Sequence, residues 1–192
     1  IFLKSLRHFA LKRLSTYPII KIWFAGCATG EEVYSVAILL NEVGILDRSL
    51  IYATDINQQS LRIAKEGIYA IDGMKQHTAN YIASGGTNSF SSYYQAKFDS
   101  VLMDKTLKKS IIFSQHNLTA DGSFNEFQLI LCRNVLIYFK RSMQNRIVNL
   151  FHESLCHFGL LGLGDKESLM FTETIKFFVE IEKTQKIYMK VN

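Results

Sequence analysis

Short apolar runs that alternate with amphipathic stretches are the feature that most restricts how this chain can fold. The first two runs span residues 19–25 and 50–54, and each is followed by apolar residues at helical spacing, over 29–40 and 58–66. Further apolar runs lie at 110–113, 127–132 and 160–163, with a helical stretch over 142–156. Strands that alternate with helices predict an α/β fold with a mostly parallel, doubly wound sheet.

The two ends of the chain add a helix and a hairpin to this pattern. Apolar residues recur at helical spacing over 2–15, and Pro18 ends that element. Near the C-terminus, the runs 177–182 and 187–191 are separated by polar residues, which predicts a terminal antiparallel hairpin. With this hairpin the predicted sheet has seven strands.

The length of the chain suits one compact domain. Its 192 residues leave no room for two full α/β domains, and no apolar run approaches the ~20 residues of a membrane helix, so we expect no membrane insertion. The chain starts at Ile1 rather than at methionine, and we expect it to begin inside a longer protein. Residues 84–96 are polar and rich in glycine and serine, which predicts a loop or hairpin tip within an insertion spanning about 70–115.

The net charge of +5 is confined to the start of the chain. Residues 1–21 contain five of the 22 basic residues and no acidic one, so 17 basic residues face 17 acidic ones from residue 22 onward. Nucleic-acid binding needs a broader basic surface, so we expect no nucleic-acid partner. Cys27, Cys132 and Cys156 lack the spacing of a disulfide framework or a zinc site. We therefore expect buried, reduced cysteines and a cytoplasmic protein without a metal.

The loop after the first strand carries the most informative residues. Ligands of doubly wound sheets bind at the carboxyl ends of the strands, and Gly26 and Gly30 bracket a tight turn there. The three-glycine dinucleotide pattern is absent, and the next helix opens with Glu31 and Glu32, which would repel a pyrophosphate. The two glutamates favour a cationic ligand such as an ammonium or a sulfonium. Thr29 and Glu32 also fit a capping box, which is the structural alternative for Glu32.

Two further strand ends carry polar residues. Asp55 ends the second strand, where a carboxylate can accept hydrogen bonds from both ribose hydroxyls of an adenosine ligand; a turn or N-cap role is the alternative. A cationic adenosine ligand without phosphates describes S-adenosylmethionine better than NAD. Arg133 and Asn134 follow the fourth strand and need partners if buried, either a ligand or other protein groups. Tyr138 is a ligand contact or one more amphipathic aromatic residue.

Four blocks of the sequence resemble the CheR-type methyltransferases, the chemotaxis receptor glutamate methyltransferases. The blocks are 22–35, which contains Gly-Cys-Ala-Thr-Gly-Glu-Glu, then 53–57, 113–118 and 132–139, which reads Cys-Arg-Asn-Val-Leu-Ile-Tyr-Phe. They occur in the family's order, and the resemblance runs through essentially the whole chain. It implies a Rossmann-like class I methyltransferase sheet over 19–192, an N-terminal helical domain that ends within 1–18, and a small β-subdomain at about 70–115.

The resemblance also implies roles for individual residues. The implied cofactor-binding set is Gly26, Thr29, Gly30, Glu31, Glu32, Asp55, Asn117, Leu118, Asn134 and Val135. Glu31 or Glu32 would meet the methionine end of S-adenosylmethionine, and Asp55 would hold the ribose. Asn117 and Leu118 would lie along the adenine. Asn134 and Val135 would lie beside the cofactor near the substrate, and Lys4, Arg133 and Tyr138 would act on the methyl acceptor.

The chain departs from the family pattern at several positions. Phe2-Leu3-Lys4 stands where the family has Phe-Phe-Arg, and lysine keeps the charge but lacks the planar fork of arginine. Val33 replaces the usual proline, and 164–167, Gly-Asp-Lys-Glu, replaces Gly-His-Ser-Glu. Asn and Thr residues that contact the cofactor in the family would precede Ile1.

The leading hypothesis is methyl transfer from S-adenosylmethionine to glutamate carboxylates of a receptor. An ionised carboxylate is already a nucleophile, so the lack of a Ser-His-Asp or Cys-His set agrees with this reaction. We expect a monomer that binds an acidic helix of a methyl-accepting chemotaxis receptor, steered by the charge of residues 1–21. A cofactor-sensing or scaffold module with little turnover is the alternative. Nucleic-acid methylation and NAD-dependent oxidoreduction are less favoured.

Overall fold

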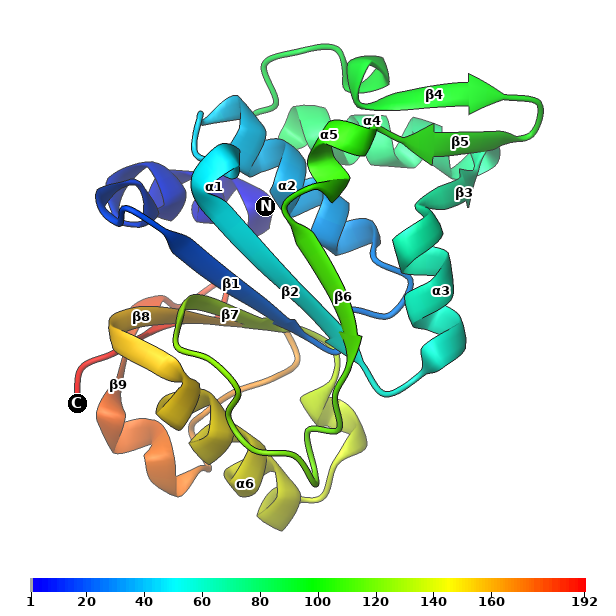
Figure 1. The fold of residues 1–192 in the computed structure, drawn as a ribbon. Helices are drawn as coiled ribbons and strands as arrows, with labels where there is room; N and C mark the ends of the chain where they lie inside the picture. Colours follow the sequence, from blue (N-terminus) through cyan, green and yellow to red (C-terminus); the bar gives the residue numbers. More distant parts are fainter. Residues whose placement is uncertain (1) are drawn as a thin grey trace.

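A seven-stranded sheet forms the centre of the computed structural model, which describes residues 2–192 apart from the side chains of residues 10 and 11 (Figure 1). Its strand order is β6-β2-β1-β7-β8-β10-β9. The five strands from β6 to β8 pair in parallel, and β10 is antiparallel to both of its neighbours. The predicted mostly parallel sheet with a terminal antiparallel hairpin is confirmed. Ile1, part of the segment predicted to end a helical domain, lies outside the described residues.

The elements agree with the predicted pattern within a few residues, except that β8 begins five residues early. The strands of the main sheet are β1 (Ile20–Ala25), β2 (Ser49–Asp55), β6 (Ile111–Gln115), β7 (Phe127–Cys132), β8 (Leu155–Leu163), β9 (Phe178–Glu182) and β10 (Ile187–Lys190). The helices beside it are α1 (Phe2–Lys12), α2 (Glu31–Glu42), α3 (Gln58–Glu66) and α6 (Arg141–Ser154). Short 3-10 helices are η1 (Leu14–Thr16), η2 (Leu46–Arg48), η3 (Ile71–Gly73), η4 (Phe90–Tyr93), η5 (Leu136–Tyr138) and η6 (Glu173–Phe177).

The sheet separates two apolar cores because alternate side chains of a strand point to opposite faces. On β1, Ile22 and Phe24 join the core under α1, α2 and α3, while Trp23 and Ala25 join the core under α6. Trp23 is fully buried, and its indole N–H donates a hydrogen bond of 2.8 Å to the Thr54 hydroxyl on β2. Because helices cover both faces of the sheet, the ends of the strands are the part that a ligand can reach. No helix among residues 2–192 is long and apolar enough to cross a membrane.

The segment between α3 and β6 forms a second, smaller sheet. Its strands pair in the order β3-β5-β4 and are antiparallel. The elements of this part are β3 (Ile68–Ala70), α4 (Met74–Ala83), β4 (Tyr94–Lys97), β5 (Ser100–Met103) and α5 (Lys105–Lys108). The range predicted for the insertion, 70–115, is therefore shifted, because the small sheet begins at Ile68 and the last five residues of that range form β6 of the main sheet.

The prediction that 84–96 forms one loop or hairpin tip is wrong. This range contains η4 and most of β4, and the tip of the hairpin is at Phe98 and Asp99, between β4 and β5. The glycine- and serine-rich stretch misled the prediction because it also contains aromatic residues that pack inward. Tyr93 is buried and its ring contacts that of Tyr81 on α4, at 6.0 Å between centroids.

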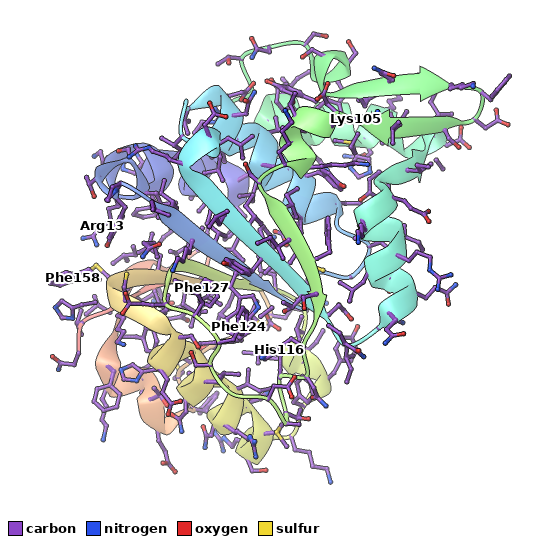
Figure 2. All side chains as sticks on the ribbon, viewed as in Figure 1. Arg13, Lys105, His116, Phe124, Phe127 and Phe158 are labelled. Carbon is purple, nitrogen blue, oxygen red and sulfur yellow. The ribbon has the colours of Figure 1, made fainter. Side chains whose placement is uncertain are left out.

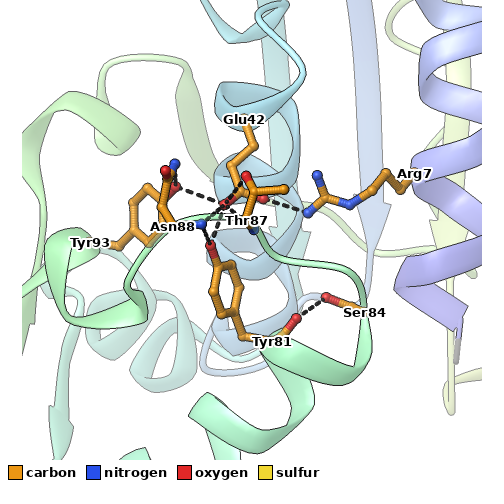
Figure 3. Close-up of polar contacts among 7 residues, drawn as sticks. All are labelled: Arg7, Glu42, Tyr81, Ser84, Thr87, Asn88 and Tyr93. Carbon is orange, nitrogen blue, oxygen red and sulfur yellow. Dashed lines mark hydrogen bonds and ion pairs between the residues drawn. The ribbon is translucent and has the colours of Figure 1, made fainter.

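A buried carboxylate joins α1, α2 and this inserted part (Figure 3). Glu42 lies at the end of α2 with its side chain 1% exposed, and it forms an ion pair of 2.5 Å with Arg7 of α1. Its other oxygen accepts hydrogen bonds from the hydroxyls of Tyr81 and Tyr93 and from the backbone N–H of Thr87. Burial acts to raise the pKa of Glu42, but the hydrogen bonds from Tyr81 and Arg7 outweigh it and lower that pKa. The segment that was expected to be a free loop is thus tied to α2.

Replacing Glu42 with glutamine is expected to lower the free energy of unfolding by about 3 kcal/mol, because Arg7 would keep its charge without a counter-ion. Because the folded-state pKa of Glu42 is lowered, its ionic contribution is complete above the unfolded-state value of about 4.3 and is lost as the pH falls through the folded-state value. The difference between wild type and Glu42→Gln should therefore shrink below about pH 4. Chemical denaturation at pH 7 and in acid measures both effects.

The matched control is Glu180→Gln, which removes the carboxylate of the more exposed Lys186–Glu180 pair, 3.7 Å apart. We expect this variant to lose less than about 1 kcal/mol. Equal losses in the two variants would contradict a special role for Glu42.

Candidate functional site

A cleft with a volume of about 680 Å³ opens at the carboxyl ends of β1, β2, β6 and β7. It lies at the point where the chain leaves the edge strand β6 and returns beside β1, which is where ligands bind in doubly wound sheets. The predicted site residues that line it are Gly26, Glu31, Glu32, Asp55, Asn117, Leu118, Arg133, Asn134, Val135 and Tyr138. The structure therefore brings together residues that are more than 100 positions apart in the sequence.

The two glycines of the first loop allow close packing around this cleft. Gly26 has φ +89°, and a Cβ atom there would lie 2.5 Å from Cγ2 of Val135. Gly30 has φ +88° and is the N-cap of α2, with Ala64 of α3 directly against it. Thr29 and Gly30, although predicted to bind the cofactor, are not among the residues that line the cleft. Larger residues at either glycine would push the loop away from its neighbours.

The capping box considered for Thr29 and Glu32 is not formed. The N-cap Gly30 makes no side-chain capping bond, and the Thr29 hydroxyl donates to the carboxylate of Glu31 instead, at 2.7 and 2.9 Å. Because the loop turns through a glycine in the left-handed region, α2 begins one residue later than a Thr29 cap would require. Glu32 is free to face the cleft, where it pairs with Arg133.

Asp55 is held in a fixed orientation by backbone groups. Its two carboxylate oxygens accept hydrogen bonds from the N–H of Ala28 at 2.8 Å and of Asn57 at 2.9 Å. Asn57, and not Asp55, is the N-cap of α3. Because a carboxylate oxygen accepts more than one hydrogen bond, Asp55 retains acceptor capacity towards the cleft.

The thiol of Cys27, next to Asp55, is not a nucleophile at neutral pH. Burial, together with the negative charge of Asp55, raises its pKa to about 12. All three cysteines are free and buried, as expected from the sequence. The cleft therefore offers no thiolate for covalent catalysis.

Arg133, the first residue of the polar pair after β7, is paired with protein groups, and both residues of the pair line the cleft. The Arg133 guanidinium pairs with Glu32, donates through Nε to the Leu163 carbonyl at 3.4 Å, and lies over the ring of Phe2 with 4.0 Å from Cζ to the ring centroid. Asn134 has a positive φ of 58°. Arg133 is therefore structurally paired and also lines the cleft, and a ligand contact of this pair stays a prediction.

Sequence reasoning missed the residue that organises this loop. Glu167 is 4% exposed, and its carboxylate accepts four backbone hydrogen bonds from Asn134, Val135, Leu136 and Gly164, at 2.6–3.0 Å. It thereby fixes the loop after β7 to the loop after β8. The available signal was a pair of acidic residues, Asp165 and Glu167, shortly after the last parallel strand.

Lys4 does not reach the cleft. Phe2 and Leu6 lie on the buried face of α1. Because successive residues of a helix are 100° apart, Lys4 lies on the opposite, exposed face. Lys4 makes no hydrogen bond or ion pair with the residues that the structure describes. The contact with the reacting centre that the resemblance implied for Lys4 is therefore not seen. Tyr138, on η5, lies at the rim with 81% of its surface exposed.

The wall of the cleft at the end of β6 contains residues that were not predicted. His116 directly precedes Asn117, and its ring packs 5.2 Å from those of Trp23 and Phe124, below the end of β6 (Figure 2). Asn117 accepts hydrogen bonds from the backbone N–H and the hydroxyl of Thr119, at 3.0 and 2.8 Å. The ring of His116 and the amide of Asn117 therefore line this part of the cleft. Such a wall suits a flat heterocycle.

The charges that line the cleft favour a cation. Three carboxylates, from Glu31, Glu32 and Asp55, face one guanidinium, from Arg133. A ligand with phosphates would meet excess negative charge, whereas an ammonium or sulfonium would be attracted. This set of hydrogen-bond acceptors fits an adenosine ligand that carries positive charge, and Asp55 lies at the strand end among them.

Comparison with known proteins identifies one family. The sequence matches the family described as CheR methyltransferase, SAM binding domain, over residues 2–186. It is 48% identical over 186 residues to the Cher3 protein of Pseudomonas putida. That alignment covers 97% of this chain and 68% of the Pseudomonas protein. It is 33% identical over 167 residues to a chemotaxis protein methyltransferase of Borreliella burgdorferi. That alignment covers 83% of this chain and 56% of the Borreliella protein.

The fold is also that of solved methyltransferases. The crystal structure of the N-methyltransferase NodS from Bradyrhizobium japonicum matches with a TM-score of 0.52 and 12% identity, over 99% of this chain and 97% of that one. At this identity the likeness concerns the fold alone, and it confirms the predicted class I methyltransferase sheet. The chain spans little more than half the length of the Borreliella relative, so it corresponds to one part of such a protein.

Replacing Asp55 with asparagine is expected to weaken S-adenosylmethionine binding by about 10- to 100-fold. The reason is that a hydrogen bond to a charged acceptor contributes about 1.5–3 kcal/mol, and the amide would also place a donor against the N–H of Ala28 or Asn57. Isothermal titration calorimetry measures the affinity. Asp47→Asn, an exposed aspartate on η2, is the control and should bind like wild type. Unchanged affinity in Asp55→Asn would contradict a ribose contact.

Replacing Glu167 with glutamine is expected to cost about 2–4 kcal/mol of unfolding free energy, because one of its oxygens becomes a donor that faces buried N–H groups. The control is Glu173→Gln, the same substitution at an exposed glutamate. Urea denaturation should separate the two variants, and a stable Glu167→Gln protein would show that the loops hold together without this carboxylate.

Proposed function

This chain belongs to the CheR methyltransferase family, and from that premise we propose that its protein methylates glutamate side chains of a chemotaxis-type receptor. The observation that carries the proposal is the cleft at the switch point of the sheet. It combines a ribose-type aspartate, excess carboxylate charge for a cationic cofactor, and a single guanidinium for an acidic acceptor.

The chemistry requires positioning more than acid–base catalysis. When bound, S-adenosylmethionine supplies a methyl group on a positively charged sulfur, which a carboxylate oxygen can attack while the sulfur leaves as a neutral thioether. A carboxylate is ionised at neutral pH, so no base has to take a proton. The unreactive thiol of Cys27 is consistent with this requirement. Holding two reactants in line accounts for up to about 7–11 kcal/mol of a barrier.

We assign the residues of the cleft to the two reactants. Asp55 holds the ribose, and the turn at Asn117 and Leu118 lies along the adenine. Glu31 and Glu32, at the start of α2, take the positively charged methionine end. Asn134 and Val135 form the wall beside the reacting atoms, where Glu167 keeps their backbone in place.

Arg133 and Tyr138 are our candidates for the acceptor carboxylate. Arg133 is the only cationic side chain that lines the cleft among residues 2–192, and its planar fork suits a carboxylate. The Tyr138 hydroxyl, at the exposed rim, can donate one further hydrogen bond. Lys4 contributes only its charge at longer range, because it lies on the outer face of α1.

The partner we propose is an acidic helix of a methyl-accepting receptor, bound by a monomer of this protein. Arg7 and Lys21, two of the five cations near the N-terminus, are already engaged by Glu42 and by Asn125. Lys4 and Lys12 are exposed and can attract an acidic surface. Three free, buried cysteines agree with a reducing cytoplasmic location, where the signalling part of such a receptor would be found.

The test is methylation of candidate receptors by the full-length protein with methyl-labelled S-adenosylmethionine. We expect base-labile label on glutamate side chains, released as methanol at high pH. Absence of this label beside an active control enzyme would reject the proposal. Retained cofactor binding without turnover on any receptor would support the alternative, a cofactor-sensing or scaffold module.

Replacing Tyr138 with phenylalanine should lower kcat for receptor methylation about tenfold and leave cofactor affinity unchanged, because only the acceptor would lose a hydrogen bond. The control is Tyr94→Phe on β4, which lies outside the cleft. Steady-state kinetics and calorimetry separate the two effects. A loss of cofactor affinity in Tyr138→Phe would place this hydroxyl on the cofactor instead.

A further inference from the structure

The cofactor cleft has a neighbour of comparable size. A second cavity of about 480 Å³ lies between α1, α4, the loop after β8 and the turn between β9 and β10. Besides the two residues it shares with the cleft, its lining includes Phe2 of α1, Ser84 at the end of α4, Asp165 of the loop after β8 and Gln185 of the turn. The shared residues are Glu32 and Arg133, and no other described residue lines both spaces. Their ion pair is therefore the common wall of the two cavities.

The pair is arranged so that its partners can separate without unfolding. The side chains are 33% exposed for Glu32 and 21% exposed for Arg133, so water reaches both. The Arg133 guanidinium rests on the ring of Phe2 at 4.0 Å and keeps one backbone hydrogen bond to Leu163. Stacking and this bond hold the guanidinium in place while its remaining N–H groups exchange an acceptor.

The Glu32 carboxylate contributes its negative charge to both cavities. In the cleft, Glu32 is one of the carboxylates that suit a cationic methionine end, and Arg133 competes with that cation for it. In the second cavity, Glu32 and Asp165 give two negative charges against the one positive charge of Arg133. An acidic side chain is repelled from this cavity as long as Glu32 remains paired with Arg133.

We propose that the Glu32–Arg133 pair is a charge-exchange switch that admits the acceptor carboxylate only after the cofactor is bound. Glu32 turns to the cation in the cleft, and Arg133, released from Glu32, presents its free N–H groups to a carboxylate that enters through the second cavity. The inference rests on the proposed function and adds an order of binding, cofactor before acceptor. The second cavity is then the entry path for an acidic side chain.

The switch makes two neighbouring substitutions act in opposite directions on cofactor affinity. Glu32→Gln removes the carboxylate that receives the cation and should weaken S-adenosylmethionine binding at least tenfold. Arg133→Gln removes the competitor and should strengthen binding by about two- to fivefold, the range expected for releasing a partly exposed ion pair. Isothermal titration calorimetry on the full-length protein without receptor gives both values.

The control for net charge is Lys166→Gln, which removes an exposed cation near the same loop and should leave the affinity within a factor of about 1.5. Weaker or unchanged cofactor binding in Arg133→Gln would overturn the switch, since Arg133 would then be a cofactor ligand or no competitor. Thermal melting of each variant excludes misfolding as the cause.

The acceptor side is tested by the order of binding. In wild type, product-inhibition and dead-end kinetics with labelled S-adenosylmethionine and receptor should give an ordered pattern with cofactor first. In Glu32→Gln, with cofactor and receptor concentrations both varied, the order should become random, because Arg133 is free from the start. A random order in wild type overturns the proposal, even if receptor methylation itself is established. If no receptor is methylated, the opposite affinity changes still decide whether Arg133 competes for Glu32.

Discussion

The geometry of the site depends on one buried carboxylate that replaces missing backbone partners. Where parallel strands end side by side, their following loops leave N–H groups that no neighbouring strand can accept. Glu167 takes four such groups from the loops after β7 and β8. With these groups satisfied, Asn134 can keep its left-handed backbone conformation, and Arg133 can leave the sheet in the direction of α2. The wall of the cleft is therefore set by a residue that does not line it.

Electrostatics then determines what this wall can bind. The start of α2 carries two glutamates where a phosphate-binding loop would offer unopposed N–H groups, and Asp55 adds a third negative charge. The one guanidinium in the cleft is held against Phe2 and Glu32, so positive charge is present but not in excess. In the proposed reaction, the cationic cofactor and the anionic acceptor would therefore bind opposite members of a single ion pair, Glu32 and Arg133.

Much of this arrangement follows from local sequence signals, and the remainder does not. The bounds of β7 and α3 agree with the predicted 127–132 and 58–66, because apolar runs and caps such as Asn57 are local properties. The strand-end rule placed Asp55 and Asn134 correctly for the same reason. The partners of Glu42 and Glu167 could not be read from the sequence, since each carboxylate binds groups more than 30 positions away. Lys4 was assigned from the resemblance, and it does not line the cleft, because Phe2 and Leu6 place the opposite face of α1 against the core.

The helix α1 is pinned at one point and touches the site at another. Arg7 binds Glu42 at the far end of α2, while Phe2 lies on the guanidinium of Arg133. Five residues of helix separate the two contacts, which is about 7.5 Å along the axis. Besides these two contacts, Leu6 is buried in the main core, so α1 is seated on the domain along one face and its first residue with described structure, Phe2, reaches the guanidinium of the cleft. The placement of α1 and the orientation of the one guanidinium in the cleft therefore depend on each other through a single aromatic ring.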